Sequence, residues 1–240
     1  MLNLVFALVA ALVVGGAIAL AGFSWVAAVI PAAVVFVGAF IVLGRRTLMQ
    51  FQAIMGEVQK ELGGLTPHDK PRDRTAKIEK AVKLLEGALP LSRYQFLLDG
   101  QIYAEIGSIR YAVKDLTGAE AAFKKATARH HYAQAMYAAL NFQRENWSDM
   151  EACFEKAVLY GKKEGMLWAA YAWCQLERKE KDKALAILQR GVATNPSDEK
   201  LKAALLSLQN DKKLKMRPWE PMWWQLGLET PPVQKVVRFR

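Results

Sequence analysis

The chain has 240 residues and a formal net charge of +10, and 52% of its residues are hydrophobic while 23% are charged. This length and composition support one or two folded domains and exclude a wholly disordered chain. The two cysteines are too few for a disulfide framework and do not match a four-ligand zinc site. The mean hydropathy of +0.03 averages a very apolar start with a polar remainder.

Residues 1–44 contain no Asp, Glu, Lys, Arg or His, and they include two apolar runs, 2–20 and 25–43. A bilayer core about 30 Å thick needs about 20 helical residues, so each run is long enough to span it. The link between the runs is very short, which predicts an antiparallel hairpin of two transmembrane helices. Small residues let such helices approach closely, and the candidates are Gly15, Gly16 and Gly38.

The alternative for the first run is a cleaved signal peptide, because residues 19–21 resemble an A-x-A cleavage site. We favour the uncleaved hairpin, since the start lacks a basic side chain and the run exceeds a usual signal core. In either case Arg45 and Arg46 follow the second run, and the positive-inside rule then places the rest of the chain in the cytoplasm. The expected location is the bacterial inner membrane, with a multi-pass topology.

Residues 47–62 have apolar side chains at helical spacing and are expected to continue the second helix outward. The Gly63-Gly64 pair should end that helix, and residues 65–74, with two prolines, should form a linker. Residues 45–74 are therefore interpreted as a juxtamembrane helix and linker.

A packing pattern of small and large residues recurs along residues 75–210 at intervals of 31 to 38 residues. Its occurrences are Ala81, Leu85 and Ala88, then Ala119, Phe123 and Ala126, then Met150, Phe154 and Ala157, and last Ala184, Leu188 and Gly191. Bulky and small residues in a preceding helix accompany the later occurrences, as with Tyr137 and Ala138. The pattern resembles the tetratricopeptide repeat, whose units are helix–turn–helix pairs of about 34 residues.

This resemblance implies an all-α fold in which the transmembrane hairpin is followed by a tetratricopeptide-like α-solenoid. Residues 198–208 would form the helix that closes the stack, as terminal repeats require. The alternative is an ordinary helical bundle with accidental spacing.

No P-loop, dinucleotide-binding or serine-elbow motif occurs in the chain. His130 and His131 are adjacent, so on a helix they point about 100° apart and cannot chelate together. Cys153 and Cys174 are interpreted as small apolar fillers. We therefore expect no enzyme activity, no cofactor and no metal.

Tetratricopeptide proteins usually bind peptides on the concave face, which the first helix of each repeat lines. At the corresponding positions this chain is apolar and aromatic and has no basic clamp, which favours a hydrophobic or helical partner. The candidate groove residues are Tyr132, Met136, Phe142, Met166 and Trp173. The alternative is that these side chains are only core or stacking contacts.

Basic residues are concentrated beside the apolar start and in the tail, residues 211–240, while residues 84–210 are nearly neutral. Anionic lipid explains this distribution better than nucleic acid, since no recognition-helix motif is present. The tail also carries Trp219, Trp223 and Trp224 among several prolines. We expect these rings to dock on the chain's own groove, on the lipid surface or on another subunit.

The sequence therefore predicts a membrane-anchored scaffold that recruits an unidentified protein partner and performs no catalysis. The alternative is an integral structural subunit of a larger membrane complex, whose hairpin packs against partner helices. An enzyme with a degenerate site is a weaker third hypothesis.

Overall fold

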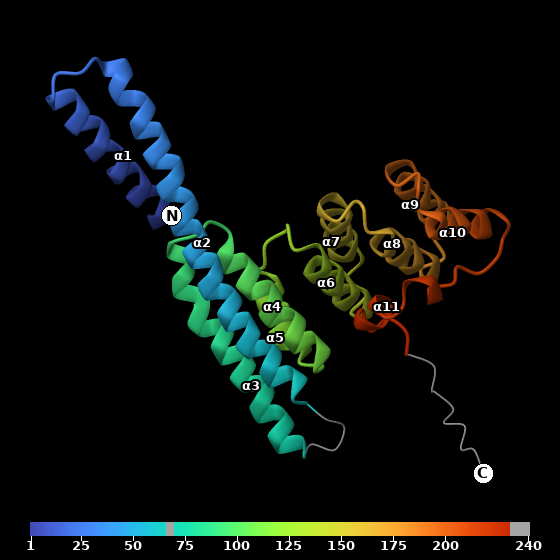
Figure 1. Cartoon of the computed structure of the whole chain (residues 1–240). Coiled ribbons are helices and arrows are strands. Elements are labelled where there is room, and N and C mark those ends of the chain that lie inside the picture. Colours follow the sequence, from blue (N-terminus) through green and yellow to red (C-terminus); the bar gives the residue numbers. More distant parts are fainter. Residues whose placement is uncertain (66–69, 231–240) are drawn as a thin grey trace, which may run out of the picture. The chain divides into compact units, whose positions relative to one another are not determined.

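The computed structural model describes residues 1–65 and 70–230 (Figure 1). These residues form helices, turns and short irregular segments, and none of the described residues lies in a β-strand. The prediction of an all-α fold is therefore confirmed. The chain divides into two compact units, Met1–Ile109 and Arg110–Arg240.

The first unit begins with α1 (Leu2–Leu20) and α2 (Trp25–Gly63), and both helices are long and apolar enough to cross a membrane. They pack against each other along the hairpin, and Gly22 takes the positive φ of +85° that the tight turn requires. Most of their large apolar side chains are exposed, as for Leu12 and Val34. The two helices thus present an apolar outer surface.

Only one of the three glycines predicted for the hairpin contact lies in it. A Cβ atom added to Gly15 would meet the Cβ atom of Ala32 at 3.2 Å, so α1 and α2 approach closely there. Cβ atoms added to Gly16 or Gly38 would have no neighbour within 4 Å. The prediction was therefore wrong for these two glycines, which lie on open faces of their helices.

Helix α2 continues beyond the apolar run and ends at Gly63, as the sequence predicts. Its 39 residues correspond to about 58 Å, roughly twice the thickness of a bilayer core. The outer half packs against α3 (Pro71–Ala88), where Phe51 and Val58 of α2 are buried. Pro71 occupies the first turn of α3, a position where its missing N–H costs nothing, so the predicted linker is shorter than 65–74. Its residues 66–69, among them Pro67 and His68, lie outside the described residues.

A 3₁₀ helix, η1 (Leu89–Arg93), follows α3, and α4 (Leu98–Ala112) continues past Ile109, so that its end belongs to the second unit. The second unit holds α5 (Leu116–Phe123), α6 (His131–Gln143), α7 (Trp147–Tyr160), α8 (Gly165–Glu177), α9 (Lys181–Thr194) and α10 (Glu199–Gln209). Helices α6 and α7 pack together, as do α8 and α9, and α10 packs on both α8 and α9 (Figure 1).

The pattern of small and large residues falls on helices of both units. Ala81, Leu85 and Ala88 are fully buried on α3 in the first unit. The later occurrences lie on α5, α7 and α9 of the second unit, except that Ala126 follows the end of α5 at Phe123. The interval 75–210 that was predicted for the repeats thus extends over both units.

Candidate groove and C-terminal strap

Helices of the second unit end in the same turn at regular intervals. Lys114, Glu145, Lys179 and Asp211 all have positive φ angles between 57° and 67°. They follow α4, α6, α8 and α10 and are 31, 34 and 32 residues apart. After each of them, the next amide donates a 2.9 Å hydrogen bond to the carbonyl five residues earlier, which is the Schellman arrangement.

This turn was not predicted, because none of its four positive-φ residues is the glycine that usually marks it. The first three turns lead into α5, α7 and α9 two residues later. The fourth turn, at Asp211, instead begins residues 211–230, which we call the strap. The strap contains only two short helical turns, η2 (Arg217–Trp219) and α11 (Met222–Gln225).

The contact between α8 and α9 depends on a small residue facing an indole. A Cβ atom added to Gly191 would lie 2.9 Å from Cγ of Trp168, so a side chain there would push the helices apart. The indole Nε1 of Trp168 donates to the carbonyl of Lys162 at 3.0 Å, and Asn195 Nδ2 donates to the same oxygen at 2.7 Å. The loop between α7 and α8 is thereby tied to the end of α9.

A partly buried ion-pair network also joins α7 to the end of α8. Glu151 Oε1 accepts hydrogen bonds from Gln175 Nε2 at 2.9 Å and from Arg178 Nη1 at 2.6 Å. Burial raises the pKa of Glu151, but these hydrogen bonds and the nearby Lys183 outweigh it and lower the pKa below its usual value. The Arg178 guanidinium also lies over the ring of Trp147 at 4.9 Å.

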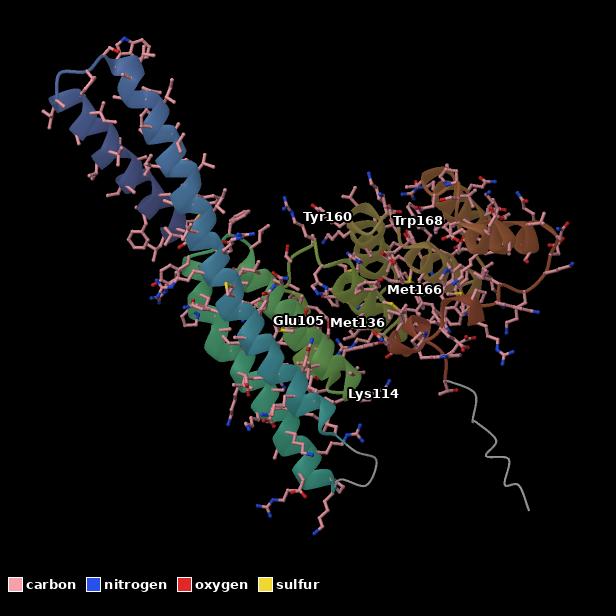
Figure 2. All side chains as sticks on the ribbon, viewed as in Figure 1. Glu105, Lys114, Met136, Tyr160, Met166 and Trp168 are labelled. Carbon is pink, nitrogen blue, oxygen red and sulfur yellow. The ribbon has the colours of Figure 1, made fainter. Side chains whose placement is uncertain are left out.

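The predicted groove residues do not form a single cluster. Phe142 and Trp173 come together, with ring centroids 5.8 Å apart, and Trp173 is 7% exposed. Tyr132 lies elsewhere, where its hydroxyl donates to Glu164 Oε2 at 3.1 Å. Figure 2 shows Met136 on α6 and Met166 on α8, and Met166 is buried while Met136 is half-buried.

The strap lies against this aromatic surface. Trp223 is fully buried and meets Trp173 edge-on, with ring centroids 5.1 Å apart and an interplanar angle of 67°. Trp219 is 8% exposed, and Trp224 is half-buried. Leu214, Met216 and Leu226 of the strap are also buried. Of the three docking surfaces expected for the tail, the described strap therefore occupies one on the second unit itself.

Hydrogen bonds to the main chain hold the strap in place. The hydroxyl of Tyr111 donates to the carbonyl of Leu226 at 2.6 Å, and Gln143 Nε2 donates to the carbonyl of Gly227 at 3.1 Å. Lys200 Nζ donates to the carbonyl of Pro218 at 2.8 Å. Burial raises the pKa of Tyr111 to about 12, so this phenol remains a hydrogen-bond donor at neutral pH. No sequence pattern predicted these partners, because Tyr111 and Leu226 are 115 positions apart.

The described histidines and cysteines, which are the remaining candidates for catalysis or metal binding, occupy structural positions. His130 caps α6, where its Nδ1 accepts from the amide of Ala133 at 3.2 Å, while Nε2 of His131 is buried without a hydrogen-bond partner. Cys153 and Cys174 are buried, and burial raises the pKa of the Cys153 thiol to about 11. Within residues 1–65 and 70–230, no group of three His, Cys, Asp or Glu side chains is arranged to hold a metal ion.

Comparisons with known protein families, with curated protein sequences and with solved structures find no match to this chain.

Proposed function

We propose that the chain is a membrane-anchored scaffold that holds another protein at the cytoplasmic face of the bacterial inner membrane, with no catalysis of its own. The observation that carries this proposal is the aromatic surface around Trp173, on which the chain seats its own strap. That surface holds an aromatic segment with two short helical turns by ring contacts and by hydrogen bonds to its main chain. The proposed partner presents a similar segment and competes with Trp223 for the same site.

The proposal treats the second unit as a short solenoid of the tetratricopeptide type. Its support is the turn repeated at intervals of 31, 34 and 32 residues, which agrees with the spacing of that family. Further support comes from the buried residues of the pattern, since Phe154 and Leu188 are both fully buried between helices. A solenoid stacks such pairs and leaves the first helices on the binding face.

The anchoring part of the proposal rests on α1 and α2. Both are long and apolar enough to cross a membrane, and their apolar side chains are largely exposed. Arg45 and Arg46 follow the apolar run within the same helix, which favours a cytoplasmic position for the polar part of the chain. In this arrangement α2 carries the chain out of the bilayer without a flexible joint.

The second candidate, an integral subunit of a larger membrane complex, also has an observation in its favour. Gly16 and Gly38 lie on open helix faces rather than in the hairpin contact. Small residues on such faces allow a further transmembrane helix to approach closely. In this candidate the hairpin, rather than the surface at Trp173, determines which proteins the chain binds.

Two changes separate the candidates when the full chain is purified from membranes in mild detergent. In the first, Trp173→Ala removes the aromatic surface, and in the second an unrelated two-span hairpin replaces residues 1–44. Quantitative mass spectrometry then compares the proteins that co-purify. A scaffold loses its partner with Trp173→Ala and keeps it after the hairpin exchange, while a complex subunit gives the opposite result.

The matched control is Leu159→Ala on α7, a side chain that is 66% exposed and outside the aromatic surface. It should leave the co-purifying set unchanged. Loss of the same proteins in this control would show that the Trp173→Ala result is not specific to the surface.

A further inference from the structure

A pocket lies in the first unit where the start of α1, the middle of α2 and the segment at η1 meet. Its wall contains Asn3 and Phe6 of α1, Arg46 and Gln50 of α2, and Leu91 and Tyr94 at η1. The lining therefore combines polar side chains, one of which carries a positive charge, with apolar and aromatic ones. That combination suits a ligand with an anionic head and an apolar body.

The floor of the pocket is fixed by buried polar contacts. Asn3 Nδ2 donates to Thr47 Oγ1 at 3.0 Å, and Thr47 Oγ1 donates to the carbonyl of Leu43 at 3.1 Å. Asn3 is 3% exposed and Thr47 is 5% exposed. The amino group of Met1 donates to the carbonyl of Arg93, which ties the η1 segment to the start of α1. The pocket is thus preformed by three separate segments of the chain.

Arg46 supplies the charge of the pocket. Its side chain is exposed and forms no ion pair with any carboxylate of the described residues. A guanidinium presents a planar fork of donors that matches the oxygens of a phosphate group. The amide of Gln50 and the hydroxyl of Tyr94 provide further hydrogen-bonding groups in the lining of the pocket.

The position of the pocket along the hairpin indicates that the phosphate belongs to a lipid. Arg45 and Arg46 are the first charged residues after the apolar run, so in the proposed anchoring they lie at the level of the lipid headgroups. At η1, Tyr94 is 39% exposed and the nearby Phe96 is 62% exposed. Aromatic side chains at that level favour the interface between lipid and water. Basic pockets at the cytoplasmic ends of membrane helices bind anionic headgroups.

We propose that this pocket binds one anionic phospholipid of the inner leaflet. Arg46 binds the lipid phosphate, Gln50 and Tyr94 hydrogen-bond to the headgroup, and Phe6 and Leu91 contact the apolar part below it. The site rests on the proposed anchoring, because only a chain that spans the bilayer places the pocket at headgroup level. The bound lipid fixes the depth of the hairpin and braces the η1 segment against α1 and α2.

The test uses the full chain in neutral detergent, titrated with phosphatidylglycerol and followed by native mass spectrometry. The control lipid is phosphatidylcholine with the same acyl chains, and the soluble control is glycerol phosphate. Arg46→Gln should weaken phosphatidylglycerol binding by about tenfold or more, since hydrogen bonds to charged groups contribute roughly that factor. Arg45→Gln is the matched control, because it removes the neighbouring charge outside the pocket, and it should change the affinity less than about twofold.

Equal losses in the two arginine variants would overturn the site, and so would equal binding of the two lipids. Displacement by glycerol phosphate at the same affinity would show that the ligand is a soluble phosphate and not a lipid. Alkaline carbonate extraction of membranes distinguishes a failure of the lipid site from a failure of the proposed membrane anchoring. If carbonate releases the wild-type chain, the anchoring and the lipid site both fail; a chain that stays integral but shows no preference for phosphatidylglycerol refutes only the lipid site.

Discussion

The indole of Trp223 in the strap meets the indole of Trp173 on α8 edge-on, at a centroid distance of 5.1 Å. The ring of Phe142 also contacts Trp173, at a centroid distance of 5.8 Å, and its centroid lies 5.7 Å from that of Trp147. Aromatic pairs in such arrangements contribute about 0.5–1.5 kcal/mol beyond their buried area. Trp223 is therefore the most deeply buried of the strap's aromatic anchors on the second unit.

Trp223→Ala should release the strap from the second unit. Truncation of a fully buried indole costs about 3–5 kcal/mol, which is several times the contribution of any one hydrogen bond to the strap. Limited trypsin digestion at Lys212, Lys213 and Lys215 should then become more than about tenfold faster. Trp224→Ala is the control, since Trp224 is only half-buried. Equal cleavage rates in wild type and Trp223→Ala would show that Trp223 does not hold the strap.

Phe154→Ala should destabilise the second unit by about 3–5 kcal/mol, the range for emptying a buried aromatic site. Phe154 is fully buried and stacks on Tyr171 with ring centroids 5.0 Å apart. The loss should lower the melting temperature of the full chain in detergent, followed by near-ultraviolet circular dichroism. Leu159→Ala on the same helix removes a side chain that is 66% exposed and should shift the melting temperature little. Similar shifts in both variants would argue against the packing described for α7.

The two cysteines should resist thiol reagents in the folded chain. Cys174 is completely buried, and burial raises the pKa of both thiols, that of Cys153 to about 11. Because the thiolate is the reactive form, neither cysteine should react appreciably at pH 8 until the chain is denatured. A reagent with a chromogenic leaving group measures this directly. Rapid modification of one thiol before denaturation would contradict the burial of that cysteine.

His131 should make the second unit less stable in mild acid. Burial lowers the pKa of its imidazole below the usual 6.5, with Glu164 opposing the shift and His130 adding to it. The unfolded chain therefore takes up this proton at a higher pH than the folded chain, so unfolding becomes easier as the pH falls below about 6.5. The stabilisation is fully present above that pH. His131→Gln should reduce the fall in melting temperature between pH 7.5 and pH 5.5, and an unchanged fall would assign it to other groups.

The apolar hairpin could be predicted from the sequence because its signal is local. An absence of charge over residues 1–44 and a short link are sufficient to predict α1 and α2. The end of α2 at Gly63 was predicted for the same reason, since a glycine pair disfavours a helix. The start of α3 was not, because Pro71 was interpreted as part of a linker although proline also suits a first helical turn.

The aromatic surface around Trp173 could be predicted only in part, because its geometry depends on contacts between distant residues. The spacing of first helices indicated that Phe142 and Trp173 lie on one face, and the structure brings them together. The sequence spacing did not indicate that the hydroxyl of Tyr111 donates a hydrogen bond to the carbonyl of Leu226. The repeated turn was missed because Lys114 and Glu145 have the positive φ angle usually taken by glycine.

The central claim is that the hairpin spans the membrane with the second unit on the cytoplasmic side. Cysteine labelling in intact cells tests this most directly, because Cys153 and Cys174 are buried and should give little background. Two variants of the full chain are compared, Ser24→Cys in the hairpin link and Lys163→Cys in the exposed loop after α7. A maleimide that crosses the outer but not the inner membrane should label Ser24→Cys in intact cells and Lys163→Cys only after lysis. Labelling of Lys163→Cys in intact cells would contradict the orientation.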